Sequence, residues 1–169
     1  SRERPRPVDA GGWNLSAPRT GGTVSVVAVS PRFDKDHVVF AGTLAGLYRS
    51  TDGGQTWQPS GSGLNSPFVD AIVISPKFEQ DHTVLVGTRQ GGLFRSTDEG
   101  NTWFAVEFWS KGASVTSVAL SPTFESDGIA IAGTEGGGVF RSTNRGRTWN
   151  PSNFGLLDTA VLSVAFSPA

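Results

Sequence analysis

The stretch Ser50-Thr51-Asp52-Gly53-Gly54-Gln55-Thr56-Trp57 decides the fold, because its pattern Ser-x-Asp-x-Gly-x-Thr-Trp returns twice more along the chain. The second copy is Ser96-Thr97-Asp98-Glu99-Gly100-Asn101-Thr102-Trp103, and the third is Ser142-Thr143-Asn144-Arg145-Gly146-Arg147-Thr148-Trp149. The Asp or Asn side chain can accept hydrogen bonds from backbone N–H groups farther along, and the glycine supplies a positive φ. Each copy therefore predicts a tight turn between strands, built by its Ser, its Asp or Asn, its Gly, its Thr and its Trp.

Other landmarks recur at the same spacing around this turn. Ser-Pro pairs begin at Ser30, Ser75, Ser121 and Ser167, so their spacings are 45, 46 and 46 residues. A Gly-Thr pair follows twelve residues after each of the first three serines, and an aromatic-Arg-Ser-Thr block leads into each turn. Self-similarity at a fixed period of this length is typical of repeat architectures.

Each repeat reads as four short strands separated by turn residues. The first strand is nearly all apolar, as expected when both faces are packed, at residues 24–29, 69–74, 115–120 and 161–166. The second, at 38–43 and its copies, carries Ala and Gly, which let a neighbouring sheet approach closely. The third, at 46–50, alternates polar and apolar residues, and the fourth starts at Thr56-Trp57 and runs toward solvent. The sequence predicts an all-β fold of four-stranded antiparallel β-propeller blades.

The repeat also predicts how the chain divides. Residues 1–10 read as a flexible leader and 11–23 as the outer strand of a partial blade, followed by blades at 24–68, 69–114 and 115–160. Residues 161–169 read as the first strand of a further blade, which makes about three and a half blades. Propellers use roughly four to eight blades, so we expect the open edges to be covered by self-association or by further repeats.

Composition narrows the classes of partner. The formal net charge is −1, from 14 basic and 15 acidic residues, which argues against nucleic-acid binding. The chain has no cysteine, which excludes disulfides and thiolate metal sites. No apolar run reaches the roughly 18 residues of a membrane span, so membrane insertion is not expected. A start at Ser1 and the lack of methionine suggest a processed, excised or engineered piece.

The three turns give the sequence its likeness to a known family. With copies in register over residues 24–169, the chain resembles the Asp-box, or BNR-repeat, β-propeller family. That family includes sialidases, xyloglucan-degrading glycosidases, sortilin-type receptors and the photosystem II assembly factor. The resemblance implies that the box is a folding element and not a catalytic one, and it favours an extracytoplasmic or lumenal location.

A sialidase-like enzyme would need a tyrosine nucleophile, an arginine cluster and paired carboxylates. The sole tyrosine, Tyr48, aligns with Phe94 and Phe140 and reads as a packing variant. The charged residues that recur in register read as structural: Arg49, Arg95 and Arg141, and the turn acids Asp34, Asp36, Glu79, Asp81, Glu125 and Asp127. His37 and His82 follow the turn aspartates and read as turn residues too. We therefore expect no catalytic, cofactor-binding or metal-binding residue in this chain.

Residues that break the repeat are the better functional candidates. The loops after the second and fourth strands should share one face of the propeller, opposite the Asp boxes. The candidates there are Arg89, Glu135, Phe108, Trp109 and Lys111, with Asp70 as a weaker one. Exposed aromatic and Arg residues often anchor protein ligands. The favoured function is a non-catalytic scaffold or protein-recognition module. The alternatives are a fragment of an Asp-box glycoside hydrolase with catalytic residues elsewhere, and an engineered or excised fragment with no ligand.

Overall fold

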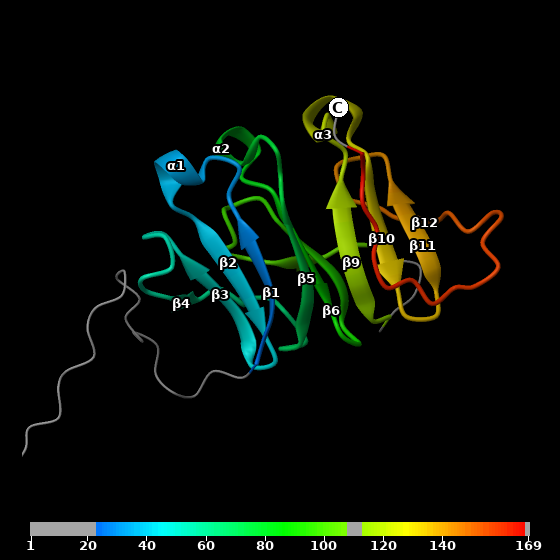
Figure 1. The fold of residues 1–169 in the computed structure, drawn as a ribbon, viewed down its shortest axis with the longest axis horizontal. Coiled ribbons are helices and arrows are strands. Elements are labelled where there is room, and N and C mark those ends of the chain that lie inside the picture. Colours follow the sequence, from blue (N-terminus) through cyan, green and yellow to red (C-terminus); the bar gives the residue numbers. More distant parts are fainter. Residues whose placement is uncertain (1–22, 108–112, 168–169) are drawn as a thin grey trace, which may run out of the picture.

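The computed structural model describes residues 23–107 and 113–167, which form three four-stranded antiparallel sheets (Figure 1). The first sheet contains β1 (Val24–Val29), β2 (Val39–Thr43), β3 (Gly46–Ser50) and β4 (Gln58–Pro59) in that order. The second contains β5 (Val69–Ile74), β6 (Val84–Thr88), β7 (Gly92–Ser96) and β8 (Phe104–Ala105). The third contains β9 (Val115–Leu120), β10 (Ala130–Thr134), β11 (Gly138–Ser142) and β12 (Asn150–Pro151). The predicted all-β fold of propeller blades is confirmed.

The outer strands are shorter than the sequence suggests. Each of β4, β8 and β12 holds two residues and begins after the tryptophan, not at the Thr-Trp pair. The reason lies in the backbone hydrogen bonds of the pair. The Thr102 N–H is donated to Asp98 inside the turn, and the Trp103 N–H is donated to the carbonyl of Ser62, in the loop after β4. These donors are therefore not available to the neighbouring strand.

One turn of helix follows each of the first strands where the sequence indicates only a turn. The three are α1 (Phe33–Asp36), α2 (Phe78–Asp81) and α3 (Phe124–Asp127). Each ends on a left-handed residue, with φ of 54° at His37, 50° at His82 and 63° at Gly128. Glycine replaces histidine in the third blade because it adopts this conformation without steric cost.

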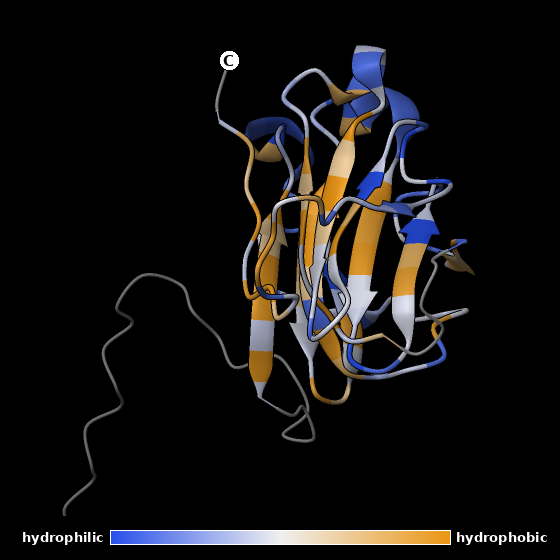
Figure 2. Cartoon of the chain, turned by 90° about the vertical axis from the view of Figure 1, so that its right-hand side faces the viewer, coloured by the Kyte–Doolittle hydropathy of each residue, from blue (hydrophilic) through white to orange (hydrophobic). Residues whose placement is uncertain are grey.

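The blades pack through the glycines of their second strands, as the sequence predicts. A Cβ on Gly42 would lie 2.6 Å from Val69 of the next sheet, and one on Gly87 would lie 2.6 Å from Val115. Two apolar clusters fill these interfaces, one around Phe40 and Phe94 and the other around Phe124 and Phe140. Figure 2 shows the hydrophobic residues concentrated in the strands and the hydrophilic ones in the turns. The core therefore lies between the sheets.

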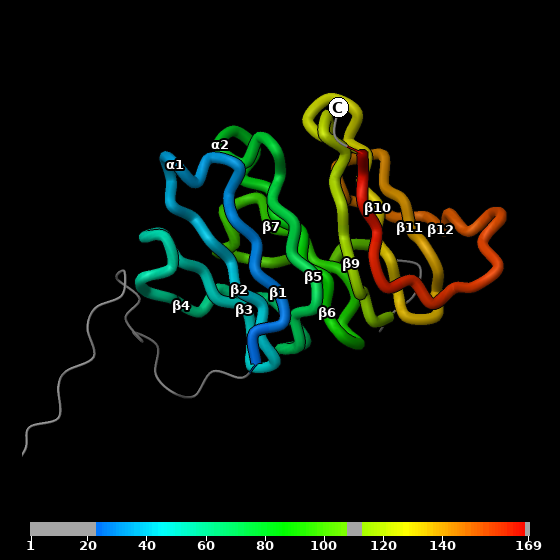
Figure 3. Tube along the Cα trace, in the orientation of Figure 1, coloured from blue at the N-terminus to red at the C-terminus, as the bar shows by residue number. Residues whose placement is uncertain are grey.

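Residues 161–166, predicted as the first strand of a further blade, belong to none of the three sheets. They run beside the third sheet, at the end of the chain in Figure 3. Val161 packs against Gly133, where a Cβ would meet it at 2.7 Å, as Val69 packs against Gly42. The Thr116 hydroxyl also donates to the Val161 carbonyl. The segment thus has the packing of a first strand, but no second strand follows to pair with it among the described residues.

β1 also departs from the prediction that first strands are packed on both faces. Val24 is 56% exposed and Val29 is 53% exposed, whereas the equivalent Val69 and Ile74 of β5 are 0% and 8% exposed. Phe33 is exposed as well, and its counterparts Phe78 and Phe124 are buried. No described sheet covers this side of the first blade. We call this surface, formed by Val24, Val27, Val29 and Phe33, the leading face.

Candidate functional site: the two ends of the sheets

The first Asp box is held by hydrogen bonds that converge on the Asp52 carboxylate. Its Oδ1 accepts from the Ser50 hydroxyl at 2.7 Å and from the Thr56 N–H at 2.9 Å. Its Oδ2 accepts from the Thr56 hydroxyl at 2.5 Å. These bonds, with the Thr56 hydroxyl first, lower the pKa of Asp52 to about 2. Asp98 receives the same set of bonds in the second box, and there burial opposes the lowering of its pKa by Thr102.

The third box keeps this geometry with an amide. Asn144 Oδ1 accepts from the Ser142 hydroxyl and the Thr148 N–H, each at 3.0 Å. The remaining contact is reversed, because the Asn144 amide donates to the Thr148 hydroxyl at 2.8 Å. A rotating hydroxyl can donate or accept, so Asn replaces Asp without losing a bond.

The recurring arginines connect each blade to the box of the next one. Arg49 Nη2 lies 2.6 Å from Glu99 Oε2 of the second box, and Arg95 Nε donates to the Arg145 carbonyl of the third box at 3.0 Å. Arg141 is exposed, and the described residues contain no box of a following blade for it to contact. These three side chains are distributed along the blades and do not meet around a common pocket.

The turn aspartates act on their own turns. Asp36, Asp81 and Asp127 each accept a hydrogen bond from the serine of the Ser-Pro pair, at 2.5, 2.7 and 2.5 Å. Each also accepts the N–H of the residue two positions ahead. The Ser121 hydroxyl is the main cause that lowers the pKa of Asp127. Asp34 is exposed beside Lys35, whereas Glu79 pairs with Arg32 at 3.0 Å.

Tyr48 and the histidines lie apart from one another. Tyr48 is half-buried opposite Ala41 and Pro59, and it borders a groove of about 490 Å³ beside Leu64. His82 Nδ1 lies 3.1 Å from Glu99 Oε1 at the interface of the first two blades. Within the described ranges, no three His, Asp or Glu side chains group as metal ligands.

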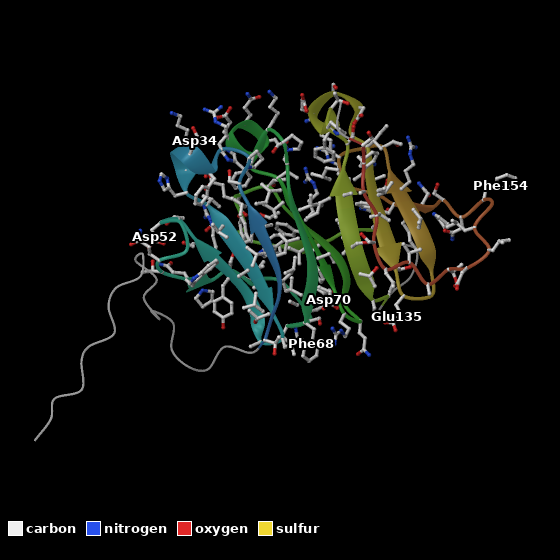
Figure 4. All side chains as sticks on the ribbon, in the orientation of Figure 1. Asp34, Asp52, Phe68, Asp70, Glu135 and Phe154 are labelled. Atoms are coloured by element: carbon white, nitrogen blue, oxygen red, sulfur yellow. The ribbon has the colours of Figure 1, made fainter. Side chains whose placement is uncertain are left out.

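The end of the sheets opposite the Asp boxes carries the predicted candidates Arg89, Asp70 and Glu135, which break the repeat. Arg89, after β6, donates to Asp70 in β5 through two bonds, Nε to Oδ2 at 3.1 Å and Nη2 to Oδ1 at 3.0 Å. Asp70 sits where the register of β5 shifts, between Val69 and Ala71. These bonds to Asp70 raise the pKa of Arg89, and the charge of Glu135 adds to the effect. In Figure 4, Asp70 and Glu135 lie at this end and Asp34 lies at the other.

We call the surface formed by Arg89, Asp70 and Glu135 the binding face. Arg89 is half-exposed, and Glu135 is exposed in the turn after β10. The structure thus brings together two of the predicted candidates, Arg89 and Glu135, with the weaker one, Asp70. Phe108, Trp109 and Lys111 lie outside the described residues.

One exposed aromatic residue on this end was missed by the sequence reasoning. Phe68 is 40% exposed directly before β5, and its carbonyl accepts the Arg89 N–H at 2.8 Å. Its counterparts in the repeat are Thr23 and Ser114. The same criterion that selected Trp109, an aromatic side chain without equivalents, would have found Phe68.

A protein-family model matches most of the chain. The family model described as Sortilin-Vps10, "Sortilin, neurotensin receptor 3", matches residues 45–168. The chain belongs to the Sortilin-Vps10 family. This agrees with the Asp-box resemblance drawn from the three boxes. No curated protein matches the chain.

Solved structures similar to this Sortilin-Vps10 family chain share its fold. A GH74 enzyme of Niastella koreensis is 22% identical with a TM-score of 0.59, over 77% of this chain and 21% of that one. YCF48 bound to D1 peptide is 20% identical with a TM-score of 0.61, over 85% and 43%. The GH74 xyloglucanase of Xanthomonas campestris is 23% identical with a TM-score of 0.53, over 78% and 22%. The chain therefore spans less than half of each, and the neighbours include both enzymes and a peptide-bound protein.

No helix within the described part of the chain is long and apolar enough to cross a membrane.

Proposed function

We propose that this chain is a non-catalytic β-propeller scaffold that recognises a protein through its binding face. We further propose that its open blades are completed by further repeats or by a second copy. The observation that carries the proposal is the division of polar residues between the two ends. The recurring Asp-box residues and arginines hold the turns and the blades together, whereas Arg89, Asp70 and Glu135, which depart from the repeat, lie at the opposite end.

The engagement of the recurring polar groups supports a structural role for them. Each box carboxylate accepts three hydrogen bonds from its own turn, as Asp52 does. A carboxylate acting in glycoside hydrolysis must instead face a substrate as acid, base or nucleophile. Arg49 and Arg95 are likewise engaged with the following blade.

The chemistry of the binding face supports recognition of a polar protein segment. The Asp70 carboxylate holds the Arg89 guanidinium in a two-bond fork, which fixes the orientation of a long side chain before any ligand arrives. Half of the Arg89 side chain remains open to solvent. Phe68 adds exposed aromatic surface beside it. Rigid Arg and aromatic side chains are the commonest anchors of protein interfaces.

The experiment is a comparison of partner binding by three variants. Immobilised chain is used to isolate a partner from parent-cell extract, and the dissociation constant of that partner is measured for each variant. Arg89→Glu and Trp109→Ala should each weaken binding by about tenfold or more, as expected for an anchor residue. Lys35→Gln, which removes an exposed charge beside the Asp-box end, is the control and should bind as the original chain does.

Two results would overturn the proposal. Equal affinity of all variants would show that the binding face does not contact the partner. Measurable hydrolysis of xyloglucan or sialosides by the chain alone would favour the glycoside hydrolase alternative.

A further inference from the structure

The interface between the second and third blades carries an arginine cluster that the proposed function does not use. Arg95 projects from β7 toward the third Asp box, where its Nε donates to the Arg145 carbonyl at 3.0 Å. Arg145 and Arg147 both border a pocket of about 270 Å³ on this box, which Arg95 does not line, and Arg145 Nη2 donates to the Glu125 carbonyl. This end of the sheets is opposite the binding face. We call Arg95, Arg145 and Arg147 the arginine cluster.

The repeat itself shows what is normally found beside such an arginine. At the equivalent position of the first interface, Arg49 Nη2 contacts the Glu99 carboxylate at 2.6 Å. Arg145 occupies the position of Glu99 in the third box, and Arg147 occupies that of Asn101. The sequence has thus replaced the carboxylate that neutralises the arginine with a second positive charge.

The surroundings of Arg95 disfavour its positive charge. Burial, followed by the charges of Arg147 and Arg145, lowers the pKa of Arg95, and Asp81 opposes this only in part. The Asp81 carboxylate already accepts from the Ser75 hydroxyl and the Thr83 N–H. The Asp127 carboxylate, which also borders the pocket, accepts from Ser121, Thr123 and Ile129. Both acids remain charged, and their carboxylate oxygens accept hydrogen bonds from their own turns.

We propose that the arginine cluster binds a dianionic oxyanion, a phosphate or sulfate group, in the place that the Glu99 carboxylate takes in the first interface. Within the described residues, Arg95 donates one hydrogen bond, from Nε. Its two terminal nitrogens, Nη1 and Nη2, are therefore left as donors for a ligand. Guanidinium groups bind tetrahedral oxyanions through such forked N–H pairs. Three guanidinium charges favour a doubly charged group over a single carboxylate.

Two substitutions test the site against a matched control. Arg145→Glu should supply the carboxylate from within the chain, because Glu99 already occupies the equivalent left-handed position with φ of 60° and Arg145 has the same φ. Arg147→Gln removes one donor without altering the turn. Lys35→Gln removes an exposed charge in the first blade, remote from the cluster.

The measurement is calorimetric titration with inorganic phosphate and with sulfate, at constant ionic strength, alongside thermal unfolding. The original chain and Lys35→Gln should bind one anion each and unfold at higher temperature in its presence. Arg145→Glu and Arg147→Gln should bind at least about tenfold more weakly. Arg145→Glu should also unfold at higher temperature than the original chain when no phosphate is present, which separates loss of the site from loss of folding.

The ligand class is tested by two further titrants. Acetate binding as tightly as phosphate would overturn the assignment to a dianion, and equal responses of all four proteins would overturn the site. Glycerol 2-phosphate distinguishes the source of the group. Tighter binding than inorganic phosphate would indicate a phosphate carried on a larger molecule, and weaker binding would indicate the free ion.

Discussion

At the scale of single residues, the first Asp box depends on the negative charge of its carboxylate as well as on its turn geometry. The carboxylate of Asp52 accepts three hydrogen bonds that only its ionised form can accept in full. Asn144 shows the limit of this role, since it keeps two acceptor contacts and turns the third into a donor contact. The negative charge is therefore useful in two boxes and dispensable in the third.

The stability of the first box should fall in acid. The pKa of Asp52 is lowered to about 2 from 3.8, so the unfolded chain takes up a proton first as the pH falls. The contribution of the ionised Asp52 side chain to the stability of the folded chain is present above pH 3.8 and is lost as the pH falls toward 2. Titration of the Asp52 carboxyl carbon by NMR should give a midpoint near 2, and Asp52→Asn should reduce the acid dependence of unfolding. A midpoint near 4 would contradict the hydrogen-bonded geometry.

At the scale of elements, each blade is joined to the next by a glycine of the box as well as by the apolar cluster. Gly100 has a φ of +84°, and a Cβ there would lie 2.6 Å from the Phe40 ring of the preceding blade. A Cβ on Gly146, in the third box, would likewise lie 3.0 Å from the Leu85 side chain of the preceding blade. The box glycine therefore serves both the turn and the contact between blades, which explains why the same eight-residue pattern recurs.

Gly100→Ala should separate these two roles. We expect a loss of about 2–5 kcal/mol in the free energy of unfolding, from a left-handed backbone at about 1–2 kcal/mol and from overpacking at about 1–3 kcal/mol. Gly155→Ala is the control, because Gly155 has a φ of +86° with no atom within 4 Å of its Cβ position. It should cost only the backbone contribution. Denaturant unfolding measures both, and equal losses would show that the contact with Phe40 is unimportant.

At the scale of the whole molecule, the first and the last blade both leave apolar residues uncovered on their outward sides. The leading face exposes Val24, Val27, Val29 and Phe33, whose counterparts in the second and third blades pack against a preceding sheet. On the other side, Ile131 and Val139 are only partly buried, whereas their second-blade counterparts Leu85 and Leu93 are 0% and 2% exposed. Such surfaces suit head-to-tail contact, which closes into a ring or continues as a chain.

Association should therefore depend on the leading face. Sedimentation equilibrium of the original chain should show species heavier than the 17.8 kDa monomer. Val29→Glu should shift the population toward monomer, because it places a charge in an interface that excludes water. Phe104→Glu changes a residue that is 69% exposed on the outer strand β8 and should leave association unchanged. A monodisperse monomer at all concentrations, or equal effects of the two variants, would refute self-association.

The sequence by itself determined the repeat, the fold class and the inner three strands of each blade within one residue, because turn chemistry and strand alternation are local properties. It missed the helical turns at Phe33, Phe78 and Phe124, since four residues are too few for a helical period. Only the tertiary structure decided that Arg49 meets Glu99, that Arg95 meets the third box and that Arg89 is held by Asp70. These partners lie 50, 50 and 19 residues apart, and such contacts follow from how one sheet rests on the next or from a shift in register within a sheet. Neither the packing of one sheet on the next nor a register shift can be predicted from the spacing of residues along the chain.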